Sequence, residues 1–368
     1  MNTAWLVPRY SPGAVFLRAR GALDGTGPFL LSEPGESVYA TPWWFRLQST
    51  ACLDGGERVE YHSAGGALLP LRRSRRWGIR RLVSLTSHFA AEYRPLGELG
   101  GVGDLVDFSQ AALDTADLIR IDSLPCPSPL FACLEQSLDA AGWLRQSWFH
   151  FGNWYLPTAG LDSAAYLAQR PSQLRRTIKR KLRGLRNAGG RFSLVTGGPA
   201  LESALADYEH VYQQSWKMPE RYGGFIPELV REAAEAGALR FGFCHLDGIP
   251  IAAQIWLVWD GRASIFKLAY DERFRPTSPG TALTWWMMRH MLDQERVAEV
   301  DFGHGDDDYK ESWLPQRRER WGIVACNPRS LAGLALAARH IGGRSIKRRL
   351  LQLATLGRPL ADPVRHGG

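Results

Sequence analysis

The sequence predicts a mixed α/β fold of the α+β kind, with two lobes whose mixed central sheets are flanked by helices. Its 368 residues suggest about two domains, since a domain commonly holds about 150 residues. Hydrophobic residues make up 45% of the chain and charged residues 22%, which indicates a globular protein rather than a disordered, collagen-like or coiled-coil one. Short alternating apolar segments lie between segments of helical periodicity, and this succession is typical of sheets covered by helices.

Composition and charge narrow the class of protein further. No apolar run reaches the ~18–20 residues that a membrane-spanning helix needs, and the N-terminus makes a poor signal peptide because it lacks a sustained apolar core. The five cysteines form no CxxC pair, so reduced thiols in the cytoplasm are the simplest interpretation. The net charge of +8 favours anionic partners without choosing among phosphate groups, nucleic acid, acidic glycans and a lipid surface.

The first region, residues 1–157, alternates strands and helices. Val, Leu, aromatic residues and alternation predict strands at Arg58–His62, Ala67–Leu71, Arg81–Thr86 and Trp143–Phe151. Helical periodicity predicts helices at Phe108–Thr115 and Pro129–Ala141.

The second region, residues 158–328, follows a break rich in Pro and Gly. Periodicity predicts helices at Ser172–Asn187, Leu201–Trp216, Phe225–Ala236 and Gly280–Glu295. Strands are expected at Arg191–Val195, Leu239–Leu246, Ile249–Trp259, Ser264–Tyr270 and Glu299–Phe302. Asp247-Gly248 and Asp260-Gly261 predict tight hairpins that join the three central strands.

The third region, residues 329–368, is expected to be a basic amphipathic helical tail. Leu331, Leu334 and Ile341 suggest one apolar stripe, and residues 347–349 are all basic. Such a helix can pack on the surface of the domain, or it can dock on an anionic membrane surface.

The helix start expected at residues 278–281 is a candidate anion site. Pro279 suits the first helical position and Ser278 the cap. Gly280 lets the backbone approach a ligand, and the amides of residues 280–282 would have no partner within the helix. Such a start binds phosphate groups, to which Arg273 and Arg275 can add charge-assisted contacts. The alternative is a capped helix without a ligand.

The segment DFGHGDDDYKESW, residues 301–313, gathers reactive side chains directly after a predicted strand. His304 or a carboxylate such as Asp306 could accept a proton from a nucleophile. Lys310 could stabilise an oxyanion or bind a phosphate. The segment makes a weak metal site, because no distal Glu completes a calcium-binding loop. As an alternative, the run of aspartates could cap a helix that starts near Tyr309.

The helix at Ser172–Asn187 is strongly cationic. Its leucines and Ile178 mark a buried face. The opposite face carries Arg175, Arg176, Lys179, Arg180, Lys181, Arg183 and Arg186. Because no acid balances these charges, we expect an anionic partner.

Searches for common catalytic motifs are negative: the chain has no G-x-S-x-G elbow, Walker A loop, H-E-x-x-H or Rossmann G-x-G-x-x-G. The nine histidines are dispersed, and His88 is interpreted as a hydrogen-bonding residue at a strand end.

A combination of motifs nevertheless resembles a known family. The motifs are R-x-x-I-x-R-x-x-R-x-L-x-x-x-G-G, W-K, L-D-G-x-P-I-A, A-Y-D-E-x-F, S-P-G-T-x-L and D-F-G-x-G-D-x-x-Y-K-x-x-W. Together they resemble the GNAT-type acyltransferase domain of the cellulose-biosynthesis-associated (CelD/BcsL-like) and FemAB-related families, over about residues 166–325. R-L-x-S-L-T-S-H-F and E-Y-R-P-L resemble the first half of the same proteins.

The resemblance implies two tandem GNAT-like lobes in a Fem-like fold, the first without its own donor site. It implies an N- or O-acyltransferase whose donor is an acyl-CoA such as acetyl-CoA and which needs no metal. The acceptor would be an amine or hydroxyl, on a surface polysaccharide, an anionic glycan or a lipid-linked carrier. FemAB relatives use aminoacyl-tRNA instead, and this is the one nucleic-acid partner considered.

The expected site residues fall into three groups. The catalytic group is Asp306, His304, Lys310 and Tyr309. The donor-binding group is Arg273, Arg275, Thr277, Ser278, Gly280 and Thr281. The acceptor-binding group is Arg176, Lys179, Arg180, Tyr270 and Trp313. A cytoplasmic enzyme is expected, with peripheral contact at the inner membrane face through the basic tail; a non-catalytic glycan- or carrier-binding protein of the same fold is the remaining alternative.

Overall fold

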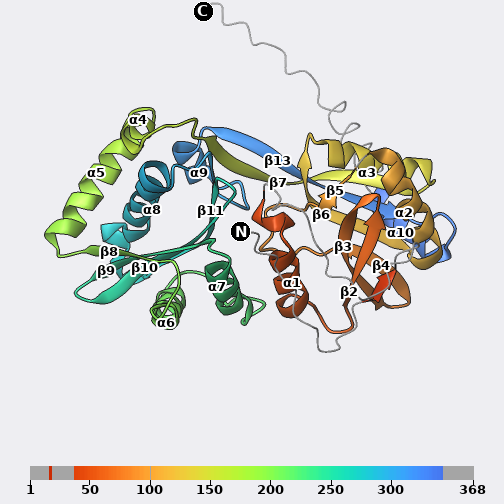
Figure 1. Ribbon diagram of the computed structural model, residues 1–368, viewed down its shortest axis with the longest axis horizontal. Coiled ribbons are helices and arrows are strands. Elements are labelled where there is room, and N and C mark those ends of the chain that lie inside the picture. Colours follow the sequence, from red (N-terminus) through yellow and green to blue (C-terminus); the bar gives the residue numbers. More distant parts are fainter. Residues whose placement is uncertain (1–15, 19–36, 100, 343–368) are drawn as a thin grey trace, which may run out of the picture.

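The computed structural model describes residues 16–18, 37–99 and 101–342, which form two lobes (Figure 1). The strands of the first lobe are β1 (Phe16–Arg18), β2 (Arg58–Ala64), β3 (Gly66–Arg76), β4 (Ile79–Ser84), β5 (Leu96–Glu98), β6 (Leu118–Cys126) and β7 (Leu144–Pro157). Its helices are η1 (Val38–Ala40), α1 (Pro42–Ala51), α2 (Val102–Thr115) and α3 (Pro129–Ala140). Every strand and helix predicted for this region is present, and β1, η1, α1, β5 and β6 are additional.

The second lobe is rich in helices on both faces of its strands. The helices are α4 (Ser163–Ala168), α5 (Ser172–Asn187), α6 (Leu201–Gln213), α7 (Phe225–Glu235), η2 (Glu272–Thr277), α8 (Pro279–Arg289), η3 (His290–Glu295) and α9 (Asp308–Trp313). The strands are β8 (Arg191–Val195), β9 (Leu239–Leu246), β10 (Ile249–Trp259), β11 (Arg262–Tyr270) and β12 (Glu299–Asp301). β13 (Gln316–Cys326), α10 (Leu331–Ala337) and η4 (Ala338–Gly342) complete the described chain.

One mixed sheet of thirteen strands runs through both lobes. Its order is β1-β2-β3-β4-β6-β13-β7-β12-β11-β10-β9-β8, and β5 pairs with β3. β13, the last strand in the sequence, lies between β6 and β7, where Ile323 pairs with Ile121 on one side and with Ser147 on the other. Figure 1 shows β7 and β13 passing from one lobe to the other. The sheet and its flanking helices confirm the predicted mixed α/β class.

Aromatic packing holds α1 and the second lobe together. Thr41 caps α1 by accepting a hydrogen bond from the Trp44 amide at 3.3 Å, and Pro42 occupies the first turn. Trp44 is fully buried, with its ring centroid 6.0 Å from that of Phe225 in α7. Phe225 also stacks on Phe89 of the first lobe, with 4.1 Å between centroids. Because these large rings exclude water between the lobes, the contact fixes the lobes relative to each other.

β11 and β12 separate at the centre of the second lobe. The two strands pair in parallel through three residues, the last being Ser264 opposite Asp301, while β11 continues to Tyr270. Beyond this point the chain after β12 turns at Gly303, where φ is 63° and an added Cβ would lie 2.9 Å from the Ile265 carbonyl oxygen. Because the strands separate here, the reactive segment of residues 301–313 leaves the sheet directly after β12.

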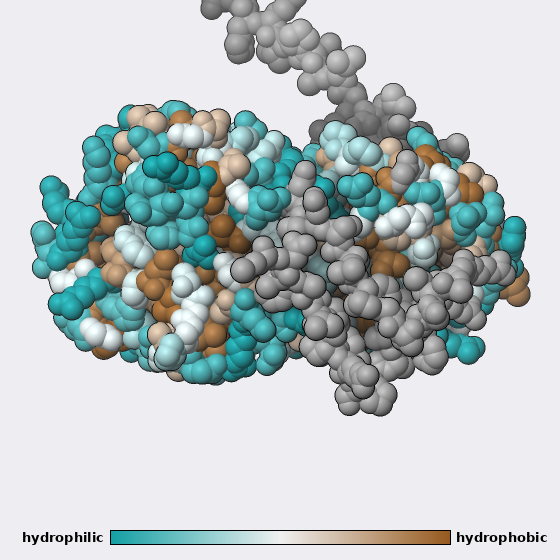
Figure 2. Space-filling model, viewed as in Figure 1, coloured by the Kyte–Doolittle hydropathy of each residue, from teal (hydrophilic) through white to brown (hydrophobic). Residues whose placement is uncertain are grey.

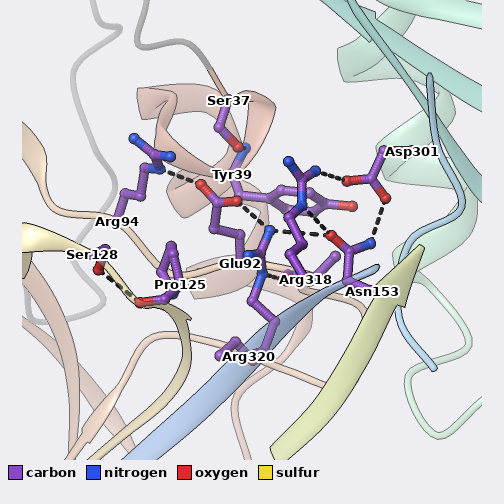
Figure 3. A network of polar contacts seen from close by, with 12 residues as sticks. Ser37, Tyr39, Glu92, Arg94, Pro125, Ser128, Asn153, Asp301, Arg318 and Arg320 are labelled. Atoms are coloured by element: carbon purple, nitrogen blue, oxygen red, sulfur yellow. Dashed lines mark hydrogen bonds and ion pairs between the residues drawn. The ribbon is translucent and has the colours of Figure 1, made fainter. Parts of the chain in front are cut away.

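A buried polar network supports that turn (Figure 3). Asn153 in β7 donates to Asp301 Oδ1 at 2.7 Å and to the Gly303 carbonyl at 2.9 Å. Arg318 in β13 donates to Asn153 Oδ1 at 2.6 Å and also bonds Asp301. Arg320 donates to the same Asn153 oxygen at 3.3 Å and to Glu92 of the first lobe at 2.7 Å. The network therefore ties the turn after β12 to both lobes.

The ends of the chain lie mostly outside the described residues. Of the predicted tail, α10 and η4 are described, whereas the basic residues 347–349 are not. Within the described residues, no helix has both the length and the apolar composition that crossing a membrane requires.

Candidate active site

The start of α8 has backbone amides without hydrogen-bond partners in the described part of the chain. Ser278 is the cap, but its backbone is left-handed, with φ of 53°, and its side chain makes no capping hydrogen bond. In the described part of the chain, the amides of Gly280 and Thr281 have no hydrogen-bond partner, and both residues are partly exposed. The Ala282 amide donates to the Ser278 carbonyl at 3.2 Å, so the expectation that this amide is free is wrong.

Cations surround this helix start. Arg273 pairs with the buried Asp271 at 2.5 Å but keeps 62% of its side chain exposed. Arg275 is exposed and has no acidic partner among the described residues. Lys181 of α5 donates to the Pro276 carbonyl at 2.5 Å and so joins the group, which the sequence did not reveal. The Thr277 hydroxyl is used within its own turn, where it donates to Phe274 at 2.7 Å.

The outer face of α5 is an exposed cationic surface. Arg176, Lys179 and Arg180 are exposed, and none of them has an acidic partner in the part of the chain that the structure describes. Ile178 and Leu185 pack inward. Figure 2 shows hydrophilic side chains along the edge of the molecule where α5 lies. The three predicted acceptor-binding cations thus face outward, and Lys181 makes the contact with the turn before α8.

Asp306 is held by neighbours that the sequence did not predict. Its carboxylate accepts from Arg317 at 2.6 Å and from Trp154 Nε1 at 2.8 Å. These hydrogen bonds, with the charge of Arg317, lower the pKa of the Asp306 carboxyl. Because Arg317 and Trp154 already bond its oxygens, we assign Asp306 to holding the loop rather than to the base.

Lys310 is equally well bound. Its ammonium donates to the carbonyls of His304 at 2.8 Å and Gly305 at 3.2 Å, and it lies 3.2 Å from Asp307. Only 4% of the residue is exposed. An ammonium group has three N–H donors, and these three acceptors match them, so Lys310 holds the loop in the conformation that presents His304.

His304 is the accessible imidazole of the loop. It is exposed, and its ring lies on Phe151 with 3.8 Å between centroids. Desolvation by the surrounding protein, followed by the positive potential of His150 and Lys310, lowers its pKa to about 4. The imidazole is therefore neutral near pH 7 and can accept a proton. Tyr309 is 46% exposed, and its pKa is raised by desolvation and by Asp307, so the phenol stays protonated.

A second group of charged residues meets this loop from other elements. Glu220 accepts from Lys267 at 2.6 Å and from the Tyr212 hydroxyl at 2.8 Å, and His88 of the first lobe lies 3.5 Å from it. Burial alone would raise the pKa of Glu220, but the hydrogen bonds from His88 and Lys267 outweigh it and bring the value to about 2. The earlier interpretation of His88 as a residue at a strand end misses this contact between the lobes.

Lys217 is the least satisfied cation near the loop. Desolvation, followed by the charge of Lys267, lowers its pKa to about 8, and Asp307 and Lys310 are close enough to act on it. In the described part of the chain its ammonium has no hydrogen-bond acceptor, and Trp216 lies beneath it at 5.8 Å. A partly buried ammonium without an acceptor is well suited to an anionic group of a substrate.

Trp216 and Lys217 lie near both the start of α8 and the loop of His304. The Trp216 ring lies 4.6 Å from that of Tyr270, and an added Cβ at Gly280 would lie 3.1 Å from the Tyr270 ring. Trp216 is thus close to the helix start through Tyr270, and Lys217 is close to the loop, whose Asp307 and Lys310 act on it. Trp313 is elsewhere: it is 4% exposed in the core of the second lobe, so it cannot contact an acceptor.

No metal-binding group of side chains occurs among residues 16–18, 37–99 and 101–342.

Comparison with known proteins supports the fold and part of the chemistry. Residues 172–311 match the family model described as an acetyltransferase (GNAT) domain. No curated protein matches the chain by sequence.

Solved structures similar to this chain have low sequence identity. FemX matches with a TM-score of 0.59 and 11% identity, over 81% of this chain and 94% of its own. The C-terminal domain of a putative lysylphosphatidylglycerol synthetase from Agrobacterium fabrum matches with a TM-score of 0.51 and 15% identity, over 77% of this chain and 87% of its own. L-PGS from Bacillus licheniformis matches with a TM-score of 0.51 and 13% identity, over 77% of this chain and 88% of its own. The chain thus has a Fem-like fold, and its residues 172–311 match a GNAT-type acetyltransferase domain.

Proposed function

We propose that the protein is an acyltransferase that moves an acyl group from acyl-CoA to an amine or hydroxyl acceptor. The observation that supports this most is that Trp216 and Lys217 are close both to Tyr270 beside the start of α8 and to the loop of His304. A donor with its phosphates at Gly280 and Thr281 would run past Tyr270 toward that loop. Arg275 and Arg273 supply the positive charge that a pyrophosphate requires.

The reaction proceeds by direct attack. The acceptor nitrogen or oxygen forms a bond with the thioester carbonyl carbon, and His304 takes the proton that the acceptor loses. Lys217 donates a hydrogen bond to the oxyanion of the tetrahedral intermediate. The C–S bond then breaks, and the imidazolium of His304 can return its proton to the departing thiolate. Lys310 and Asp306 act by holding the loop.

For the acceptor we propose a cell-envelope polysaccharide or its precursor, in line with the resemblance to the CelD/BcsL-like proteins. The outward cations Arg176, Lys179 and Arg180 fit an anionic glycan or a lipid-linked carrier. We place the reaction in the cytoplasm, where acyl-CoA is made.

A panel of CoA thioesters tests the donor. A thioester at 100 times its Kd should stabilise the protein by about 2.7 kcal/mol, which thermal unfolding detects easily. R275A should weaken this stabilisation, whereas R183A, which removes an exposed cation from α5, should not. If no thioester shifts the unfolding temperature and none is consumed with an acceptor, the proposal fails.

A second candidate is an aminoacyl-tRNA-dependent peptide transferase. The cationic face of α5 and the likeness to FemX favour it. Affinity for tRNA would then fall steeply with salt, because phosphate contacts release counterions, and charge reversal at Arg176 and Arg180 would reduce it. Activity that survives nuclease treatment and high salt excludes this candidate. Binding of either donor without turnover would instead indicate a binding protein.

A further inference from the structure

The turn between β3 and β4 carries an unexpected residue. Trp77 and Gly78 form this two-residue turn with φ of 51° and 78°. A bulky residue in the left-handed region costs about 1–3 kcal/mol, and such turns favour Asn-Gly or Asp-Gly. The β9–β10 and β10–β11 hairpins follow that rule, with Asp247-Gly248 and Asp260-Gly261 at similar angles, and the β2–β3 hairpin turns through Gly65-Gly66. Turn geometry therefore does not explain Trp77, whose side chain is 81% exposed.

Arginines surround this exposed ring. Arg75 and Arg76 are exposed and have no acidic partner among the described residues. The Arg76 guanidinium lies 4.5 Å from the centre of the Trp77 ring. Arg75 stands directly opposite Arg80 in the β3–β4 register, although like charges in facing positions are unfavourable. The hairpin thus concentrates positive charge at its tip.

A hollow of about 560 Å³ lies at the base of the same hairpin, lined by Arg58, Arg73, Arg75 and Arg80 among others. Arg73 pairs with Glu60, and Arg80 pairs with Asp117. Arg75 keeps its charge uncompensated. Because Glu60 and Asp114 also line the hollow, the positive charge available to a ligand is that of Arg75, on the side of the hairpin tip.

The exposed face of α10 lies beside this hairpin. Asp117 connects the two, because it accepts from Arg80 at 2.8 Å and its carbonyl accepts from the Asn327 amide at 3.0 Å, just before α10. Figure 1 shows α10 beside β4 at this end of the first lobe. Leu331 is 88% exposed and Leu334 45%, and these positions share one helix face. The neighbouring cations are exposed: Arg329 and Arg339.

We propose that this end of the first lobe is a docking surface for a bilayer that contains anionic phospholipid. Trp77 enters the headgroup region, which indole rings favour because one end is apolar and the other polar. Leu331 and Leu334 bury apolar area beside it, and Arg75 and Arg76 meet lipid phosphates. Nucleic acid fits less well, because the apolar face of α10 would gain nothing from phosphates. The inference does not depend on the proposed function.

Flotation of the full chain with vesicles tests the surface. We expect binding to vesicles of phosphatidylcholine with phosphatidylglycerol and not to phosphatidylcholine alone. Each basic residue near an anionic surface contributes about five-fold to partition, so R75E/R76E should reduce binding on the order of 30-fold or more. The double variant R183E/R186E on α5 changes the net charge equally and should bind like wild type.

W77D separates docking from folding. It gives the turn the Asp-Gly pair of the β9–β10 and β10–β11 hairpins, so the unfolding temperature should stay unchanged or rise while vesicle binding falls at least ten-fold. The proposal is overturned if W77D binds vesicles like wild type, or if R183E/R186E loses as much binding as R75E/R76E. It is also overturned if the wild-type protein does not bind these vesicles, and W77D instead abolishes its binding of single-stranded RNA or its self-association.

Discussion

Lys217 and His304 set the charge state in which the candidate site would work. The pKa of His304 is lowered to about 4 and that of Lys217 to about 8. Since His304 must be neutral and Lys217 charged, kcat/KM should rise through about pH 4, stay level and fall above about pH 8. H304Q should lower the rate 10²-fold or more, because general base catalysis is typically worth about 10²–10⁴-fold.

K217R provides the control for this pH profile. Arginine keeps its charge at every accessible pH, so the alkaline fall should disappear while most of the rate remains. K217M should reduce kcat by about 10²-fold, which is the usual effect of removing one oxyanion donor. An alkaline limb that persists in K217R would assign it to another group.

At the same scale, the sequence identified reactive residue types but not their partners. His304, Asp306 and Lys310 were found because they follow a strand within a few residues. The sequence does not indicate that Arg317 donates hydrogen bonds to Asp306. Nor does it indicate that all three N–H groups of the Lys310 ammonium have acceptors. Glu220 and His88 meet only after the lobes pack, so no local pattern predicts their contact.

At the scale of single elements, prediction succeeded where the signals were local. β9 and β10 have the predicted bounds because the turn of Asp247 and Gly248 fixes where each strand ends. α1 was missed because its two tryptophans pack into the core on contact with α7, which local periodicity does not reveal. β13 was missed because its first half is charged, and those charges are satisfied only in the buried network.

Two helical glycines predict opposite effects of one substitution. Gly184 lies within α5 with nothing within 4 Å of an added Cβ, so G184A should raise the free energy of unfolding by about 0.5–1 kcal/mol. At Gly333 in α10 an added Cβ would lie 2.1 Å from the Asn327 carbonyl oxygen. G333A should therefore lower the unfolding temperature. Denaturation of both variants measures this, and equal effects would contradict the described packing.

At the scale of the whole molecule, the pair of Glu92 and Arg320 joins the lobes through buried charge. Both residues are at most 2% exposed. R320M removes the largest compensating charge on Glu92 while Arg94 and Arg262 remain, so it should cost unfolding free energy of no more than about 3–5 kcal/mol. The double variant E92M/R320M should recover a large part of that loss. Urea denaturation of the three proteins measures the coupling, and strictly additive losses would contradict it.

The same pair predicts how stability depends on pH. Burial alone would raise the pKa of Glu92, but Arg320, Arg94 and Arg262 outweigh it and hold the value at about 2, below the ordinary 4.5. A lowered carboxyl pKa contributes stability that is present above about pH 4.5 and is lost as the pH falls toward 2. E92Q should be less stable near neutrality and should lose less on acidification. Melting temperatures measured across this range would refute the assignment if both proteins declined in parallel.

The place of β13 has a consequence for how the protein is made. Strands β6 and β7 leave the ribosome long before residues 316–326, yet each needs β13 as its hydrogen-bonding neighbour. The first lobe therefore cannot complete its sheet until nearly the entire polypeptide has been synthesised. Until then the edge of β6, which includes Ile119 and Ile121, has no partner strand and can pair with other chains. Nascent chains stopped before Gln316 should need chaperone protection that the finished protein does not.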